Sequence, residues 1–231
     1  MTADDAVSAD DRPAGPRRRW LTVVVAAGAL ITAVLLGGAG GLLLASSADD
    51  TGGAQAPDPV DIGFAQDMTV HHQQGVTLAS WARDHSDDPA IQRLAGDVEI
   101  GQSDQIGRMQ GWLGVWGQPA SADGAPMAWM PGRDHQMNMA EGRMMPGMAN
   151  NAEIDRLRAL SGRDLDVYFL QLLIRHHQGG AAMMRAAIDG AAVGEVRNLA
   201  ARMLDAQTAE IEAMTRMLTD RGAAPLPAPG G

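Results

Sequence analysis

Two adjacent pairs of histidines draw attention first, because each pair opens the same short motif. The motif is His-His-Gln followed, after one residue, by glycine, and the pairs are His71–His72 and His176–His177. On a helix, neighbouring residues point about 100° apart, so we expect one imidazole of each pair to face the interior. The apolar pattern around them predicts that His71 and His176 lie nearest the centre, with His72 and His177 only slightly off it. A neutral imidazole is a common metal ligand, and the alternative is a hydrogen-bonded core residue.

Further candidate donors lie at helical spacing from these histidines. Asp67 and Met68 precede the first pair by four residues each, and Met183 and Met184 follow the second pair by two turns. Residues at these spacings share one face of a helix. Thioether and imidazole together suit copper, and the thioether selects Cu(I) in particular. Because the chain has no cysteine, any soft ligand must be methionine.

A methionine-rich stretch, residues 127–148, holds further soft donors. It contains seven methionines, and its prolines and glycines interrupt any long helix. Several thioethers in one pliable loop would suit Cu(I), whereas the alternative is that they cap the domain as adaptable hydrophobic side chains. The candidate ligands here are Met137, Met139, Met144, Met145, Met148 and His135.

Both histidine motifs belong to an internal duplication with an offset of 105 residues. The same offset continues downstream, where it pairs Gln102 with Gln207 and Met109 with Met214. Each unit shows apolar residues at spacings of three and four, which is typical of amphipathic helices, with one break in the middle. The breaks are at 86–89 and 190–194, so the second unit is expected to form helices at about 163–190 and 195–221. Two helical hairpins predict an all-α four-helix bundle.

The N-terminal part contains a long apolar segment. Residues 21–45 carry no charge and follow three arginines at 17–19. This length can cross a membrane, and the arginines predict that residues 1–20 are cytoplasmic and the bundle lies outside the cell. A cleavable signal sequence, which would leave the domain secreted, is the alternative. The remaining boundaries are a linker at 46–60, the bundle at 61–222 with its methionine-rich connection at 118–162, and a disordered tail at 223–231.

Charge and composition exclude some partners. The formal net charge is −10, and affinity for nucleic acids depends mainly on clustered basic residues. We therefore expect no nucleic-acid partner. Two Phe and one Tyr in 231 residues leave few good strand formers, which agrees with an all-helical chain.

The duplicated F-x-Q-x(4)-H-H-Q-x-G unit and the Met-Pro-Gly-Met segment resemble the bacterial family catalogued as domain of unknown function 305, over about residues 60–222. The resemblance implies a ferritin-like bundle in the cell envelope, with some members tied to copper binding and copper resistance. The family's motif falls on Asp61, Asp67, Met68, His71, His72 and Gln73, and again on Asp166, His176, His177, Gln178, Met183 and Met184. The second unit has Leu172 and Leu173 where the first has Asp67 and Met68, so we do not expect two identical sites.

These observations predict an extracytoplasmic protein that buffers or sequesters copper through histidine and methionine, with no turnover of its own and no catalytic residue. One alternative is a metal-free helical module that binds a partner protein. A ferritin-like metal oxidase is less favoured, because such sites need Glu-x-x-His pairs and no histidine here has a glutamate three residues before it.

Overall fold

The computed structural model describes residues 55–130 and 145–229, which form helices and no strand. The all-helical prediction is therefore confirmed for this part of the chain. The predictions for residues 1–20, for the apolar segment 21–45 and for most of the linker lie outside the described residues. The helices are α2 (Pro59–His85), α3 (Pro89–Val115), α4 (Asn151–Ala159), α5 (Gly162–Gly190) and α6 (Gly194–Asp220).

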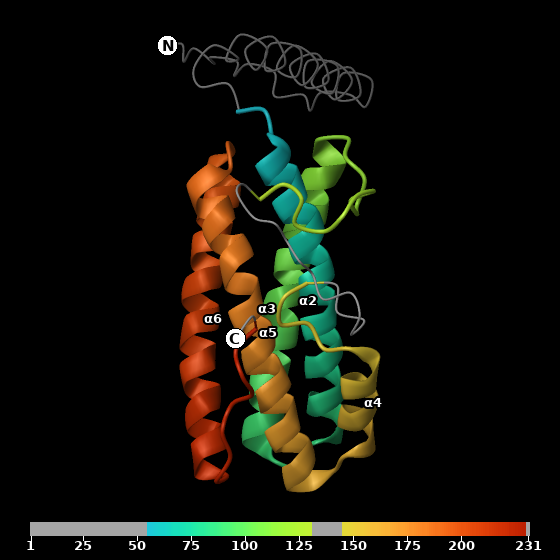
Figure 1. Ribbon diagram of the computed structural model, residues 1–231, viewed down its shortest axis with the longest axis vertical. Helices are drawn as coiled ribbons and strands as arrows, with labels where there is room; N and C mark the ends of the chain where they lie inside the picture. Colours follow the sequence, from blue (N-terminus) through green and yellow to red (C-terminus); the bar gives the residue numbers. More distant parts are fainter. Residues whose placement is uncertain (1–54, 131–144, 230–231) are drawn as a thin grey trace, which may run out of the picture. The chain divides into compact units, whose positions relative to one another are not determined.

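Four long helices lie side by side, and they are paired as the duplication predicts (Figure 1). Helix α2 packs along α3 and helix α5 along α6, and the two hairpins meet where α2 packs along α5. Helices α3 and α6 are not among the closely packed pairs. The short helix α4 lies in the connection between the hairpins, beside α5, and was not predicted from the sequence.

Local sequence explains where the long helices begin and end. Asp88 precedes α3 and accepts a hydrogen bond from the backbone of the first turn, and Pro89 occupies the first helical position, where no N–H is needed. Gly117 and Gly222 follow α3 and α6 with φ angles of 65° and 61°. Glycine adopts this left-handed conformation without steric cost, so it stops a helix readily.

Two aspartates at equivalent places in the repeats fasten the hairpins to each other. Asp61 on α2 accepts hydrogen bonds from the backbone N–H groups of Ala192 (3.1 Å) and Val193 (3.0 Å), in the turn between α5 and α6. Asp166 on α5 accepts one from the hydroxyl of Ser86 (2.6 Å), in the turn between α2 and α3. The first helix of each repeat therefore holds the turn of the other repeat. This assigns a structural role to two aspartates that the family resemblance had singled out.

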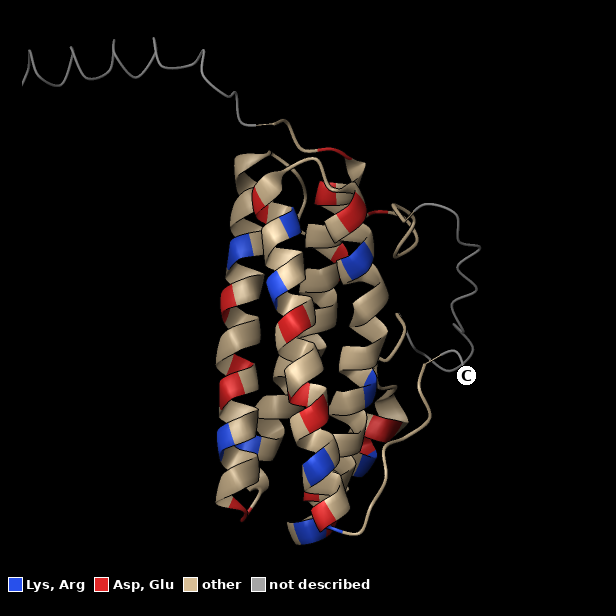
Figure 2. Cartoon of the chain, turned by 90° about the vertical axis from the view of Figure 1, so that its left-hand side faces the viewer, with Lys and Arg blue, Asp and Glu red and all other residues tan. Residues whose placement is uncertain are grey.

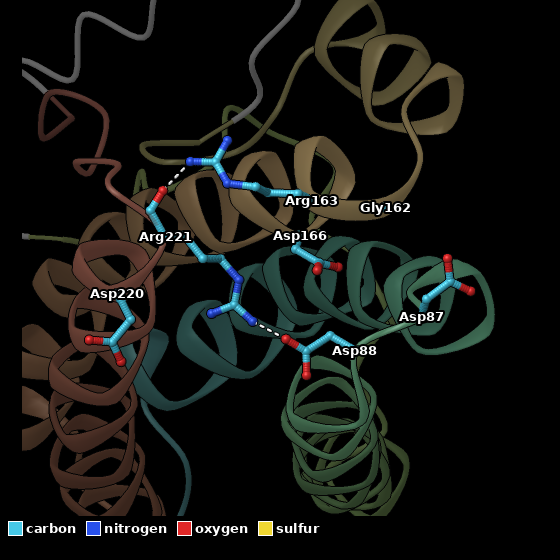
Figure 3. Close-up of a pocket in the computed structure, with 7 residues that line it drawn as sticks. All are labelled: Asp87, Asp88, Gly162, Arg163, Asp166, Asp220 and Arg221. Atoms are coloured by element: carbon cyan, nitrogen blue, oxygen red, sulfur yellow. Dashed lines mark hydrogen bonds and ion pairs between the residues drawn. The ribbon is translucent and has the colours of Figure 1, made fainter.

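The end of the bundle near Asp166 is hollowed by a polar cavity of about 580 Å³ (Figure 3). Four aspartates and two arginines line it. Arg221 forms an ion pair with Asp88, and Arg163 donates to the backbone carbonyl of Arg221 (Figure 3). The arginines balance part of the acidic charge. Their polar contacts link the start of α3, the start of α5 and the end of α6.

The core has a methionine-rich half and an aliphatic half. One hydrophobic cluster contains nine buried methionines, among them Met109 and Met203. The other is built mainly from leucine, alanine, isoleucine and Phe169, with Met214 as its one buried methionine. Soft sulfur donors are thus concentrated in one half of the described domain.

Charged residues are spread along the outer faces of the helices (Figure 2). In that view acidic and basic residues alternate along the bundle instead of gathering into one basic band. Within residues 55–130 and 145–229, no helix is both long and apolar enough to span a membrane.

Candidate metal centre

All four histidines of the two motifs are fully buried, each with 0% of its surface exposed. The rings of His71 and His176 lie against each other where α2 meets α5, with centroids 3.9 Å apart and planes inclined by 35°. The rings of His72 and His177 lie 6.3 and 6.1 Å from those of His71 and His176, respectively. The expectation that one imidazole of each pair faces the interior was therefore incomplete. The second imidazole is buried too, because it faces the other helix of its own hairpin.

The two central imidazoles bond to backbone carbonyls. Nε2 of His71 donates to the carbonyl oxygen of Pro146 (3.2 Å), and Nε2 of His176 donates to the carbonyl oxygen of His71 (2.9 Å). A carbonyl oxygen only accepts hydrogen bonds, so the proton of each neutral ring must reside on Nε2. These bonds fix the tautomer and the orientation of both rings.

The two outer imidazoles bond to side chains of the neighbouring helices. Nε2 of His72 donates to the side-chain oxygen of Gln105 on α3 (2.7 Å), and Nε2 of His177 donates to the carboxylate of Glu210 on α6 (2.6 Å). Gln105 and Glu210 are themselves 105 residues apart, so they are repeat counterparts. Sequence reasoning missed both, although the offset that pairs Gln102 with Gln207 could have found them.

While each Nε2 atom has a partner, the Nδ1 atom of each of these four imidazoles is buried without a hydrogen-bond partner. Burial lowers the pKa of His71 to about 4 and, together with the nearby His71, that of His72 to about 3. Burial and the other histidines also hold the pKa of His176 well below its usual value. Rings that are neutral and protonated at Nε2 carry a lone pair on Nδ1, and metal-bound histidines are fixed in the same way through their other nitrogen. The four Nδ1 atoms are therefore nitrogen donors of the kind that binds a metal ion, left unused by the protein itself.

Three of the candidate thioethers are buried on the two helices that carry the histidines. Met68, Met183 and Met184 are all fully buried, in the methionine-rich half of the core. At Gly180, an added Cβ would lie 3.3 Å from Cε1 of His71 and 3.6 Å from the methyl carbon of Met184. The missing side chain thus lets the methyl group of Met184 and the His71 ring approach the same space.

The equivalent glycine of the first repeat has a different neighbour. At Gly75 an added Cβ would overlap the side-chain oxygen of Gln102, at 2.1 Å. The amide of Gln102 therefore occupies the space that the missing side chain of Gly75 leaves. The side-chain oxygen of Gln207, the counterpart of Gln102, is 3.7 Å from the corresponding point at Gly180, so the first repeat is packed more tightly here.

Asp67 positions the methionine-rich segment. One of its carboxylate oxygens accepts hydrogen bonds from the backbone N–H of Met127 (2.6 Å) and from the indole N–H of Trp129 (2.8 Å). Burial raises the pKa of this carboxyl. Asp67 thus holds residues 127–129 on α2, a role that the sequence did not reveal.

The described methionines of the connection are part of the same core. Met127, Met130, Met145 and Met148 are at most 7% exposed and join the cluster that contains Met68, Met183 and Met184. They pack as the capping alternative predicted, and their sulfur atoms lie in the same half of the core as those of Met68, Met183 and Met184. The predicted ligands Met137, Met139, Met144 and His135 lie outside the described residues.

The Met-Pro-Gly-Met segment, residues 145–148, packs against the buried histidines. The carbonyl oxygen of Pro146, which accepts the hydrogen bond from His71, lies directly over Gly179. An added Cβ at Gly179 would be only 2.0 Å from this oxygen, so the contact requires glycine. Gly147 takes a φ of 82° at this contact. The Gln74 side chain exchanges two hydrogen bonds with the backbone of Ala149, at 2.9 and 2.6 Å. Both repeats therefore anchor the segment.

Replacing Gly179 with alanine is expected to lower the free energy of unfolding by about 1–3 kcal/mol, the usual cost of overpacking. The added methyl would force the segment 145–149 away from α5 and weaken the bond to His71. Gly107→Ala is the matched control, because an added Cβ there meets nothing within 4 Å and alanine favours helix. Urea unfolding of the three proteins measures the effect. A Gly179→Ala protein as stable as the control would contradict the contact.

Carboxylates and histidines alone do not complete a metal site in the described residues. Within 55–130 and 145–229, no three His, Asp or Glu side chains are arranged to hold one ion.

Comparisons with known proteins agree with this architecture. The model of a family described as domain of unknown function (DUF305) matches residues 61–218. The structure of a DUF305 protein from Streptomyces coelicolor is 39% identical, with a TM-score of 0.65 over 73% of this chain and 97% of that one. A DUF305 fragment from Deinococcus radiodurans is 34% identical, with a TM-score of 0.58 over 71% and 98%. None of the curated proteins matches the chain.

A more distant structural relative was solved with metals. CopM in its Cu(I)-bound form is 22% identical, with a TM-score of 0.54 over 69% of this chain and 96% of that one. Structures of CopM with Cu(II) and with Ag are similar to this chain to the same degree. At this identity the likeness shows a shared fold.

Proposed function

Because this chain belongs to the DUF305 family, we propose that it is an extracytoplasmic protein that binds copper, favouring Cu(I), and buffers or sequesters it without a reaction of its own. The metal-bound forms of CopM, which shares the fold, support a link to copper.

The observation that carries this proposal is the set of four buried, unpartnered Nδ1 atoms on the two helices that also bury Met68, Met183 and Met184. A buried polar atom without a partner costs roughly 1–3 kcal/mol, so four of them are expensive unless a ligand satisfies them. The donors would come from His71, His72, His176 and His177, with sulfur from Met68, Met183 and Met184 and from the connecting segment.

The chemistry of these donors favours a soft monovalent ion. Neutral imidazole and thioether bring no negative charge, and neither must lose a proton before it binds. Thioethers select Cu(I) over harder ions. The fully buried rings also exclude water, so the ion would be stored rather than presented to a substrate.

Binding of a monovalent soft ion should stabilise the fold by mass action. With Ag⁺ at 100 times its dissociation constant, the free energy of unfolding is expected to rise by about 2.7 kcal/mol. For a domain of this size, that corresponds to an increase in Tm of roughly 5–10 °C. Thermal melting of the full chain in mild detergent, with Mg²⁺ as the hard-ion control, measures it. Identical melting with and without Ag⁺, and no copper retained by the chain from copper-supplemented cells, would instead favour the metal-free module.

The N-terminal segment supports a location at the cell membrane. Residues 21–45 are uncharged, follow three arginines, and precede the described domain. We place the domain outside the cell, attached by this segment as a single-pass anchor or released by its cleavage. The mass of the protein isolated from membranes distinguishes these two fates, and a full-length chain in the cytosolic fraction would contradict both.

A further inference from the structure

A second polar site lies between the two helices that do not pack closely. A cavity of about 20 Å³ opens between α3 and α6, and its polar lining consists of Gln102, Gln105, Gln207 and Glu210. These are two pairs of repeat counterparts, since 105 residues separate Gln102 from Gln207 and Gln105 from Glu210. We call this site the α3–α6 seam. Its volume is enough for a single particle of the size of a water molecule.

Two amides in the seam are buried without partners. Gln102 is 4% exposed, and neither its side-chain oxygen nor its side-chain nitrogen forms a hydrogen bond. Gln207 is 5% exposed, and its side-chain oxygen is also without a partner. A leucine or methionine in either place would avoid this cost, so the amides are better explained by something they contact transiently.

The seam connects solvent with the outer histidines. The Glu210 side chain is 33% exposed and also bonds His177, which is fully buried. Gln105 makes the equivalent bond to His72. The seam's small residues, Gly101 and Ala206, are again repeat counterparts, and nothing lies within 4 Å of where a Cβ of Gly101 would be. Polar side chains therefore lead from the surface to the Nε2 atoms of the outer imidazoles.

On the side where α2 meets α5, packed residues cover the histidines. There the rings of His71 and His176 lie in contact, and the segment 145–149 is bonded over them through Pro146 and Ala149. An ion that crossed this side would have to displace packed core, whereas the α3–α6 seam offers oxygen ligands at the surface and inside.

We propose that the α3–α6 seam is the uptake site for a soft monovalent cation, Cu(I) or Ag⁺. The carboxylate of Glu210 attracts the ion, and the amide oxygens of Gln102 and Gln207 replace part of its water before it reaches the imidazole nitrogens. This replacement matters because moving a bare ion into a protein interior costs several kcal/mol. The proposal rests on the proposed function, since it requires a buried site that receives the ion.

Two substitutions test the seam, each with a matched control. Glu210→Gln removes the charge but retains an acceptor for His177, as Gln105 provides for His72; Glu212→Gln makes the same change at an exposed position of the same helix. Gly101→Leu fills the mouth of the seam, and Gly107→Leu places the same side chain at an exposed position of α3. Stopped-flow tryptophan fluorescence after mixing the full chain with Ag⁺ gives the loading rate, and competition with a chelator gives the affinity.

We expect Glu210→Gln and Gly101→Leu to slow the loading of Ag⁺ about tenfold or more. Tenfold is the lower end of the effect that charged clefts have on association rates. Both control variants should load at the wild-type rate. The affinity of Gly101→Leu should stay unchanged, because it alters the route and not the imidazoles. If the wild type binds Ag⁺ and both seam variants load at the wild-type rate, the uptake site is wrong while the copper site stands. If the wild type binds no Ag⁺ or Cu(I), the proposed function and the uptake site both fail.

Discussion

Lowering the pH from 6.5 to about 4 is expected to unfold the helical domain. A histidine of the unfolded chain takes up a proton near pH 6.5, whereas burial holds the pKa of His71 at about 4 and that of His72 at about 3. The unfolded state therefore binds more protons in this range, and each such histidine lowers the stability by about 1.4 kcal/mol per pH unit. Two of them cost about 6 kcal/mol at pH 4, and His176 adds to this. Typical domains are stable by only about 5–15 kcal/mol.

Buried carboxyls act in the opposite direction. Burial raises the pKa of Asp61 and of Asp67, so their protonation in the folded state offsets part of the loss, but only at the acid end of this range. Above about pH 7.5 these histidines are almost entirely neutral in both states, and their contribution no longer changes with pH.

Circular dichroism at increasing urea, repeated at half-unit steps of pH, measures this dependence. His72→Gln removes one titrating ring and should reduce the slope by about one proton, whereas His85→Gln, at an exposed position, is the control. A stability that stays constant between pH 6.5 and 4.5 would show that the imidazoles of His71, His72 and His176 are not buried as described.

Replacing Met183 and Met184 with leucine is expected to lower the affinity for Cu(I) on the order of 10- to 100-fold or more, since even the loss of an outer-shell partner of a metal has an effect of this size. Leucine has nearly the volume of methionine but no sulfur, so the stability should change by less than about 1.5 kcal/mol. The double variant therefore separates the role of the sulfur atoms from that of core packing.

Met214→Leu is the control for this experiment. Met214 is also fully buried, but in the aliphatic half of the core. Competition with a Cu(I) chelator should give wild-type affinity for this variant. Equal affinities for the wild type, Met214→Leu and the double variant would remove Met183 and Met184 from the site and support the view that they only fill the core.

The main features of the fold follow from local sequence. The apolar spacing, the Asp88–Pro89 start of α3 and the glycines at 117 and 222 place the long helices within a few residues of their observed bounds. The offset of 105 residues predicts two hairpins. These signals are local or repeated, so they can be recognised without knowing which segments meet in space. Helix α4 was missed because it lies in a stretch interpreted as a loop.

The details of the candidate site depend on tertiary contacts that spacing does not encode. The burial of His72 and His177 depends on Gln105 and Glu210, 33 residues away in each repeat, and the tautomer of His71 depends on Pro146, 75 residues away. Asp67 was predicted beside the histidines because residues four apart share a helix face. The structure uses one of its oxygens to hold Met127 and Trp129, which no periodicity could indicate.

Nitrogen-15 NMR of the imidazole rings during titration with Ag⁺ tests the central claim most directly, because it observes each ring nitrogen separately. We predict that Nδ1 resonances of the buried histidines shift as the first equivalents of Ag⁺ bind, while their Nε2 atoms keep their attached protons and their acceptors. Nδ1 resonances that do not change in the presence of excess Ag⁺, or binding that instead removes the Nε2 protons, would contradict a metal centre built on the buried Nδ1 lone pairs.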